Sequence, residues 1–132
     1  AIGLVANTFE SSMRLGLMLF PWPNQCNVDH NTAVRTPCLP NNAGNITNQL
    51  FGVGNPPDNA TPIGRAIEQA TQHFNQRQDL GRRKFIALVT DGGETCRGRP
   101  VEAAQRAMAQ EIPFGTRGTI GCRNRMHSSS SR

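Results

Sequence analysis

The sequence predicts an α/β fold, with helices on both sides of a mainly parallel central sheet in three layers. Two continuous runs, Leu15–Phe20 and Phe85–Val89, show no polar face, which is typical of strands buried on both sides. Helical apolar spacing precedes and follows each run, and parallel neighbours need helical crossovers. The 132 residues correspond to a single domain.

In the first half of the chain, Ile2, Val5 and Phe9 recur at helical spacing, which predicts an amphipathic helix over 1–12. A strand follows over 14–20. Residues 24–40 are polar and are expected to be irregular. Residues 41–51 are expected to form a short helix.

In the second half, Thr61 and Pro62 begin the clearest helix, which is expected to reach about Gln78. A basic turn over 81–84 leads into a strand over 85–89. Pro100 begins a third helix, and its spacing points Val101, Ala104 and Met108 inward.

The chain after Phe114 departs from this pattern. Glycines interrupt the strand expected there, and four serines stand close to the last residue. We therefore divide the sequence into a domain over 1–114 and an irregular tail over 115–132, whose last dozen residues are expected to be disordered.

The charge is positive, at +5, and 13 of the 14 basic residues are arginines. The sequence has no Tyr, one Trp and no basic helical stripe interleaved with aromatic residues, so no nucleic-acid partner is expected. No apolar run approaches the roughly 18 to 20 residues of a membrane span, so no transmembrane segment is expected.

The four cysteines, Cys26, Cys38, Cys96 and Cys122, form no Cys-x-x-Cys motif. An even count is compatible with two disulfides, which indicates an oxidising, extracytoplasmic compartment. Pairing of Cys26 with Cys38 would tie down a loop that has little core of its own, and Cys96 with Cys122 is the second candidate pair. Three pairings are possible for four cysteines.

Two oxygen-bearing side chains are expected at the carboxyl edge of the sheet, where ligands bind in open α/β folds. Asp91 follows the strand over 85–89, and Thr61 stands at a helix start. A hydroxyl and a carboxylate suit Mg²⁺, Mn²⁺ or Ca²⁺. Each residue also has a simpler explanation, Thr61 as a helix N-cap and Asp91 as a turn residue.

Enzymatic and zinc chemistry are not expected. Glu94 stands near Asp91, but no nucleophile or histidine base lies beside either in the sequence. The spacings of His30, His73 and His127 match no zinc pattern.

Three stretches together resemble the von Willebrand factor type A domain, especially its bacterial envelope kind: Arg14–Phe20, Ala60–Ile67 and Phe85–Glu94. The resemblance covers about residues 1–114. It implies a metal-ion-dependent adhesion site assembled from three loops. By motif match, Thr61 corresponds to the threonine of the second loop and Asp91 to the aspartate of the third.

The sequence departs from that family in its first loop, Asp-x-Ser-x-Ser, which is absent. In the family this loop closes a central strand just before the first helix, and the chain begins inside that helix, so we interpret it as a truncated domain. Ser11 and Ser12 follow the helix and do not replace the loop. Because a hard cation takes about six oxygens, binding of Mg²⁺ (or Mn²⁺ or Ca²⁺) is expected to be weak or absent.

The resemblance implies a non-enzymatic role in protein binding or cell adhesion. A divalent cation would bridge the domain to an exposed acidic side chain of a protein partner. The alternative is a metal-independent structural or interaction module of the cell envelope.

Overall fold

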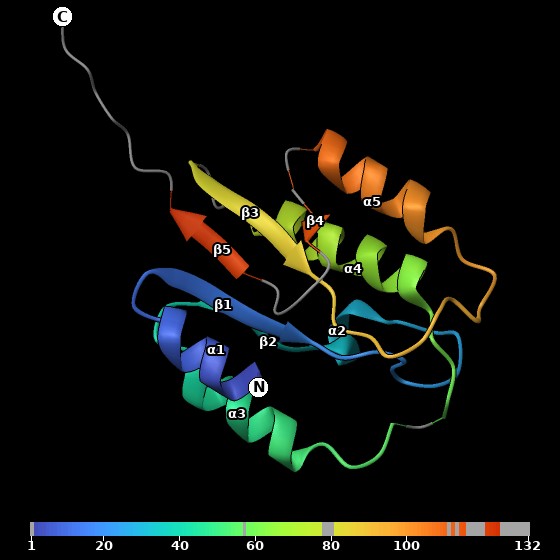
Figure 1. The fold of residues 1–132 in the computed structure, drawn as a ribbon, viewed down its shortest axis with the longest axis horizontal. Helices are drawn as coiled ribbons and strands as arrows, with labels where there is room; N and C mark the ends of the chain where they lie inside the picture. Colours follow the sequence, from blue (N-terminus) through green and yellow to red (C-terminus); the bar gives the residue numbers. More distant parts are fainter. Residues whose placement is uncertain are drawn as a thin grey trace, which may run out of the picture.

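The computed structural model describes residues 2–56, 58–77, 81–110, 112, 114–115 and 121–124 (Figure 1). Its elements, in chain order, are α1 (Ile2–Phe9), β1 (Met13–Met18), α2 (His30–Ala33), β2 (Val34–Leu39), α3 (Ala43–Gly52), α4 (Ile63–Gln76), β3 (Arg82–Ala87), α5 (Pro100–Ala109), β4 (Phe114–Gly115) and β5 (Gly121–Asn124).

The strands form one sheet in the order β2-β1-β5-β3-β4. β1 pairs antiparallel with both β2 and β5, and β3 pairs antiparallel with β5. Only the short β3–β4 pairing is parallel. The predicted three-layer fold with a mainly parallel sheet is therefore wrong, because β5 separates the two apolar strands that were expected to define a parallel sheet.

Strand β2 lies within the segment 24–40, which the sequence predicted to be irregular. Its buried residues are Thr36 and Cys38, whose small and partly polar side chains give no apolar alternation. Pro37 is tolerated because β2 is an edge strand. Gly16 of β1 permits the close approach, since a Cβ there would lie 2.9 Å from both the Cys38 amide nitrogen and the Thr36 carbonyl oxygen.

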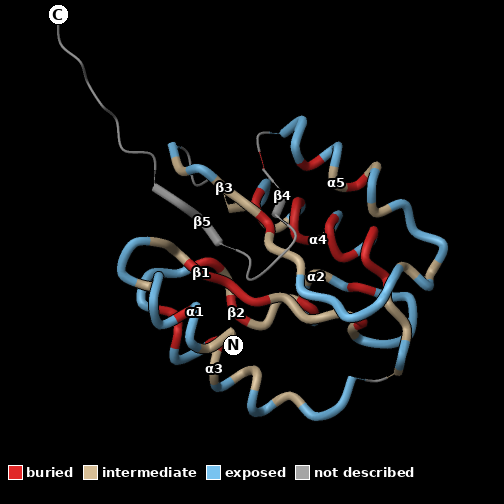
Figure 2. The backbone as a smooth tube through the Cα atoms, in the orientation of Figure 1, coloured by how far each residue is buried: buried red, intermediate tan, exposed pale blue. Residues whose placement is uncertain are grey.

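The helices form two clusters on different parts of the sheet (Figures 1 and 2). One cluster joins α1 and α3 to β1 through the buried residues Ala6, Leu15, Leu17, Ala43 and Ile46. The other joins α4 and α5 to β3 through Ile63, Ile67, Ala70, Phe74, Ile86, Ala103 and Ala107, with Cys38 and Ile112. No helix within the described part of the chain is long and apolar enough to cross a membrane.

The helices occur close to their predicted positions, but two of them bury residues other than those expected. In α1 the buried residue is Ala6, and Val5 and Phe9 are partly exposed. In α5, Ala103 and Ala107 are buried, whereas Val101 and Met108 are 65% and 59% exposed. Ile2 packs against the cluster of α1 and α3, but the other large apolar side chains of these two helices are exposed.

The region around β3 also differs from the prediction. The strand begins at Arg82, so the basic residues expected in a turn over 81–84 lie within β3, and only Gly81, with a φ of 79°, remains in the turn. Within the predicted tail 115–132, Gly115 ends β4 and Gly121–Asn124 form β5. Residues 116–120 and 125–132, including the serines, lie outside the described residues.

Candidate functional site

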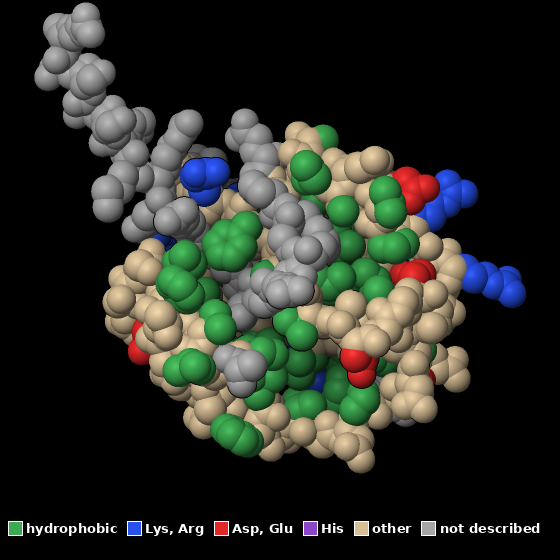
Figure 3. All heavy atoms as spheres, viewed as in Figure 1, with side chains coloured by type: hydrophobic (Ala, Val, Ile, Leu, Met, Phe, Trp, Pro, Cys, Tyr) green, Lys and Arg blue, Asp and Glu red, His purple; other side chains and the backbone are tan. Residues whose placement is uncertain are grey.

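A cavity of about 550 Å³ opens between β1 and β3 at their carboxyl ends. Its walls come from Leu17–Pro21 and Ile86–Asp91, and its base comes from α4. Figure 3 shows hydrophobic side chains gathered on this face of the molecule, with acidic atoms at the margin of the group. The remaining lining residues are Ile2, Pro56, Asp58, Asn59, Ala60, Thr61, Ala66, Ile67 and Ala70.

Thr61 and Asp91, the two residues predicted as ligands, line this same cavity. Gly92, the residue after Asp91, approaches Thr61, since a Cβ placed on Gly92 would be 3.8 Å from the Thr61 hydroxyl oxygen. Asp91 is exposed, and Thr61 is half-buried. The structure thus brings together two side chains that are thirty positions apart in the sequence.

The start of α4 is capped by Glu94 rather than by Thr61. The cap position is occupied by Pro62, which makes no side-chain cap bond. Instead, one carboxylate oxygen of Glu94 accepts a hydrogen bond from the Gly64 amide at 2.8 Å, and the other accepts one from the Cys96 amide at 2.8 Å. A carboxylate at this helix end also interacts favourably with the helix dipole. The Thr61 hydroxyl is therefore not the cap that its position in the sequence suggested.

The backbone of Thr61 is held by Thr95. The Thr61 amide donates to the Thr95 hydroxyl at 2.7 Å, and the Thr95 amide donates to the Thr61 carbonyl at 3.2 Å. Gly64 allows this contact between helix and loop, because a Cβ there would lie 2.9 Å from the Arg99 amide nitrogen. The loop after β3 is thus fastened to the start of α4 on the side where Asp91 lies.

Asp58 is a second carboxylate in the cavity lining, beside Asp91, and was not identified from the sequence. One carboxylate oxygen accepts from the Gln25 amide at 2.6 Å, and the other accepts from the Ala60 amide at 2.8 Å. The bond to Ala60, two residues further on, is typical of an aspartate in a turn. That local signal was present in the sequence, but the bond to Gln25 was not foreseeable because it joins distant loops.

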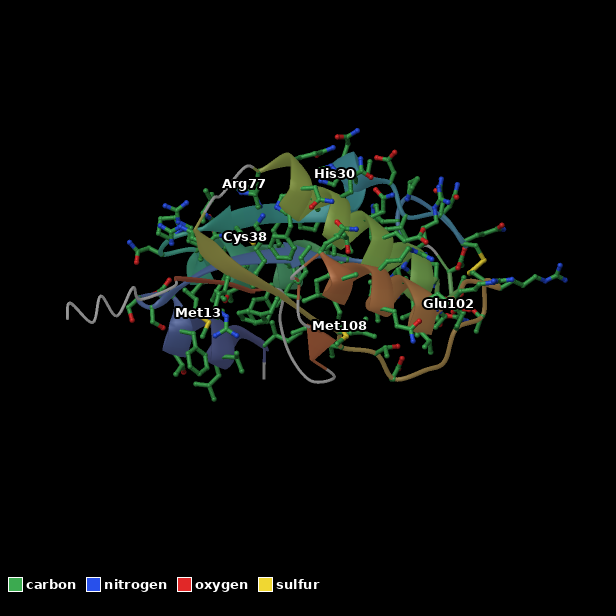
Figure 4. All side chains as sticks on the ribbon, turned by 90° about the horizontal axis from the view of Figure 1, so that it is seen from above. Met13, His30, Cys38, Arg77, Glu102 and Met108 are labelled. Carbon is green, nitrogen blue, oxygen red and sulfur yellow. A yellow bond between two sulfur atoms is a disulfide. The ribbon has the colours of Figure 1, made fainter. Side chains whose placement is uncertain are left out.

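The disulfide joins Cys26 to Cys96, with an S–S distance of 2.05 Å (Figure 4). The predicted pairing of Cys26 with Cys38 is wrong. Cys26 lies in an exposed loop, whereas Cys38 is buried in the core beside α4, so the two cannot meet. The second predicted pair, Cys96 with Cys122, is wrong as well, because the Cys96 sulfur is bonded to Cys26. The disulfide fastens the loop after β3 to the loop after β1.

His30 meets His73 of α4, near Cys38 and Arg77; Figure 4 labels His30, Cys38 and Arg77. Their nearest ring nitrogens are 3.1 Å apart, which is a hydrogen-bond distance. Burial, His30 and Arg77 together lower the pKa of His73 to about 4. Within the described ranges, no group of three or more His, Cys, Asp or Glu side chains is arranged to hold a metal. His127 lies outside those ranges.

The comparisons with known proteins assign no family. No protein-family model matches the chain, and no solved structure matches it. The chain is 35% identical over 71 residues to a protein of Bacillus subtilis (strain 168) named as uncharacterized protein YwmC. That match covers 54% of this chain and only 30% of YwmC. The resemblance to the von Willebrand factor type A domain therefore stays a prediction.

Proposed function

We propose that the chain is a non-enzymatic protein-binding domain that recognises an acidic group of a partner through a divalent cation held by Thr61 and Asp91. The observation that carries the proposal is that both side chains line one cavity. Glu94, and not Thr61, accepts the hydrogen bond that caps the start of α4. Among the described residues, neither the Thr61 hydroxyl nor the Asp91 carboxylate has a hydrogen-bond partner. Both are therefore available to a ligand.

The donor types fit Mg²⁺, Mn²⁺ or Ca²⁺, which bind hydroxyl, carboxylate and water oxygens. The donor number is small. Asp58 lines the same cavity and adds negative charge, and each of its oxygens accepts one backbone hydrogen bond. The remaining positions of the cation are left to water and to the partner's carboxylate. We expect an affinity on the order of 10⁻³ M without a partner.

A bound cation would supply a positive charge that attracts the partner's carboxylate. The surrounding residues hold the two ligands in position. Thr95 fixes the backbone of Thr61, and the disulfide and Glu94 fix the loop that carries Asp91. This arrangement binds a partner without making or breaking a bond. The disulfide also supports a location outside the cytoplasm, in the secreted space or the cell envelope, because disulfides persist in oxidising compartments.

The experiment is a titration of the full chain with Mn²⁺, followed by paramagnetic line broadening of backbone amides. Broadening is expected around Thr61 and Asp91. Asp91→Asn removes the negative charge of the carboxylate, and Thr61→Val removes the hydroxyl oxygen. Each variant should weaken Mn²⁺ binding by at least about tenfold. Glu102→Gln removes an exposed carboxylate of α5 and is the matched control. Broadening that is identical in the wild type and Asp91→Asn would contradict the proposal.

The second candidate is a metal-independent interaction module of the cell envelope. The observation that favours it concerns Asp58 and Glu94. Each of their carboxylates accepts two hydrogen bonds from backbone amides, so both act in holding the loops in place. Such a rim is a rigid protein surface. Partner binding that survives chelation and is lost on reduction of the Cys26–Cys96 disulfide would favour this candidate over the cation site.

A further inference from the structure

The helices α1 and α3 lie side by side and run in opposite directions on one face of the sheet (Figure 1). Just after α1, the Glu10 carboxylate accepts a hydrogen bond at 3.0 Å from the amide of Ala43, the first residue of α3. Nearer the other end of α1, a Cβ placed on Gly3 would lie 3.3 Å from the Thr47 hydroxyl oxygen. The two helices therefore form one continuous outer surface.

The outer surface of this helix pair is apolar. Leu4 of α1 is 74% exposed and Phe51 of α3 is 85% exposed, and Val5 and Phe9 of α1 are also exposed. Phe51 stands one helical turn beyond Thr47, so it lies near the end of α1 that carries Leu4. We call the side chains of Leu4, Val5, Phe9 and Phe51 the apolar patch. Figure 3 shows hydrophobic atoms over both helices.

A basic residue borders the apolar patch on the same side of the sheet. Arg83 of β3 is opposite Arg123 of β5, which is opposite Met13 of β1. Positions directly opposite each other face the same side of a sheet, and Met13 packs against the cluster of α1 and α3. Arg83 therefore faces the side of α1 and α3, and it is exposed. Figure 3 shows Lys and Arg atoms at the start of β3 in this view.

Negative charge is scarce in this half of the molecule. The helices α1 and α3 contain no charged residue, and the strands β1, β2 and β3 contain no Asp or Glu. Glu10, just after α1, is half-buried, and its carboxylate is bonded to the Ala43 amide. The surface thus combines exposed apolar side chains with a positive border, which complements an apolar layer that carries negative headgroups.

The size of the apolar patch also bears on its occupant. With their exposures, the four side chains present on the order of 500 Å². A stable protein–protein interface buries roughly 800 Å² on each partner, so the patch is small for a dimer. A lipid surface needs no matching shape, because Leu, Val and Phe side chains enter the boundary between headgroups and acyl chains one by one.

We propose that the face formed by α1 and α3 docks on the surface of a bilayer that contains anionic phospholipid. The apolar patch enters the boundary between headgroups and acyl chains, and Arg83 lies at the level of the phosphates. The docking is peripheral. It uses residues other than Thr61 and Asp91, so it does not depend on the cation site of the proposed function.

The experiment is co-sedimentation of the full chain with vesicles, in the presence of a chelator so that no divalent cation contributes. One kind of vesicle is phosphatidylcholine alone, and the other contains equal parts of phosphatidylcholine and phosphatidylglycerol. We expect binding to the mixed vesicles to be at least about tenfold stronger and to weaken as the salt concentration is raised. Absence of binding to the mixed vesicles, or equal binding to both kinds, overturns the proposal.

Variants of the apolar patch test which face binds. Leu4→Ser with Phe51→Ser removes two exposed side chains and leaves the core unchanged, and it should weaken binding by at least about tenfold. Val101→Ser with Met108→Ser removes two exposed apolar side chains of α5 and is the matched control, which should bind like the wild type. An equal effect of the two double variants overturns the proposal.

The basic border has its own pair of variants. Arg83→Gln should weaken binding to the mixed vesicles about fivefold, because one positive charge near the phosphates is lost. Arg65→Gln removes an equally exposed charge from α4 and should leave binding unchanged. If the two variants weaken binding equally, the attraction depends on net charge alone, and the assignment of the face is overturned.

A fluorescence readout keeps the side chain aromatic and does not require loss of binding. In Phe51→Trp, the introduced Trp should be quenched by phospholipids with brominated acyl chains. The wild type is the control, since its one Trp, Trp22, packs against a different cluster and should stay unquenched. A bound variant whose emission equals that of the wild type overturns the proposal.

Two further results separate this inference from its alternatives. Dimers that the Leu4→Ser, Phe51→Ser variant abolishes, together with no binding to vesicles, overturn the proposal, because the occupant is then a second copy. The cation site is tested independently: Asp91→Asn should leave vesicle binding in chelator unchanged whether or not the wild type binds Mn²⁺.

Discussion

Glu94, in the loop after β3, accepts a hydrogen bond from the Gly64 amide at 2.8 Å and thereby caps a helix thirty residues earlier in the sequence. The same carboxylate holds the Cys96 amide, next to the disulfide. Glu94 thus joins the start of α4 to the loop that carries Asp91, and the disulfide of Cys96 joins that loop to the loop after β1. The cap belongs to the tertiary structure and not to the helix's own sequence.

Replacement of Glu94 by Ala should destabilise the fold by about 1–3 kcal/mol, since two backbone amides lose their acceptor. Chemical denaturation measures the loss. Glu102→Gln is the control, because the Glu102 carboxylate has only a 4.0 Å contact with the exposed Arg99. Equal stability of the two variants would mean that the cap contributes nothing.

Two glycines in helices should respond in opposite directions to alanine. Gly64→Ala places a Cβ 2.9 Å from the Arg99 amide nitrogen, so either the helix or the loop must shift, at a cost of about 1–3 kcal/mol. Gly44→Ala in α3 meets nothing within 4 Å and should stabilise the fold by about 0.5–1 kcal/mol. Thermal unfolding of both variants tests the pair, and a stabilised Gly64→Ala would contradict the packing described here.

The pH dependence of stability should carry a contribution from His73. Its pKa in the folded chain is about 4, below the ordinary value of 6.5, so between these values the unfolded chain binds more protons. The free energy of unfolding is therefore expected to fall as the pH falls from about 6.5 to about 4. Because His73 is only half-buried, solvent screening reduces the effect to on the order of 1 kcal/mol.

The measurement is urea denaturation of the wild type and His73→Gln across this pH range. The variant has no titrating group at this position, so the stability difference between the two proteins should change with pH below 6.5 and stay constant above it. A difference that is independent of pH throughout would remove His73 as the cause.

Loss of the disulfide should lower stability by about 2–4 kcal/mol, because the bond closes a long loop with a sequence separation of 70. Cys26→Ser with Cys96→Ser leaves two small polar side chains at this exposed contact. Denaturant unfolding of the double variant, compared with the oxidised wild type, gives the value. A double variant as stable as the wild type would show that the loops are already held by Glu94, Thr95 and Asp58.

The sequence was sufficient to predict where the helices form and which strands are apolar, because these depend on local periodicity. It was not sufficient to predict the sheet. β2 was missed because Thr36 and Cys38 give no apolar signal, and the place of β5 depends on pairings with distant residues. The buried faces of α1 and α5 were predicted wrongly for a related reason: both helices bury alanines, while most of their larger apolar side chains are exposed.

The candidate site was predictable in part. Thr61 and Asp91 were identified from residue type and position, and the structure places both at one cavity. Asp58 and the pairing of Cys26 with Cys96 were missed, because each depends on the loop after β1 meeting loops from the second half of the chain. The role of Glu94 as a cap could not be seen in the sequence, since its partner Gly64 precedes it by thirty residues.

The loops at the rim also have a consequence for the order in which the molecule assembles. Gln25 and Asp58 are 33 residues apart, Thr61 and Thr95 are 34 apart, and the disulfide joins positions 70 apart. Contacts between such distant positions form late in folding, because the chain loses loop-closure entropy before it gains their energy. We therefore expect the helices to form before these loop contacts. A newly made chain would then pass through a state that has its helices but in which the loops around the cavity are not yet joined.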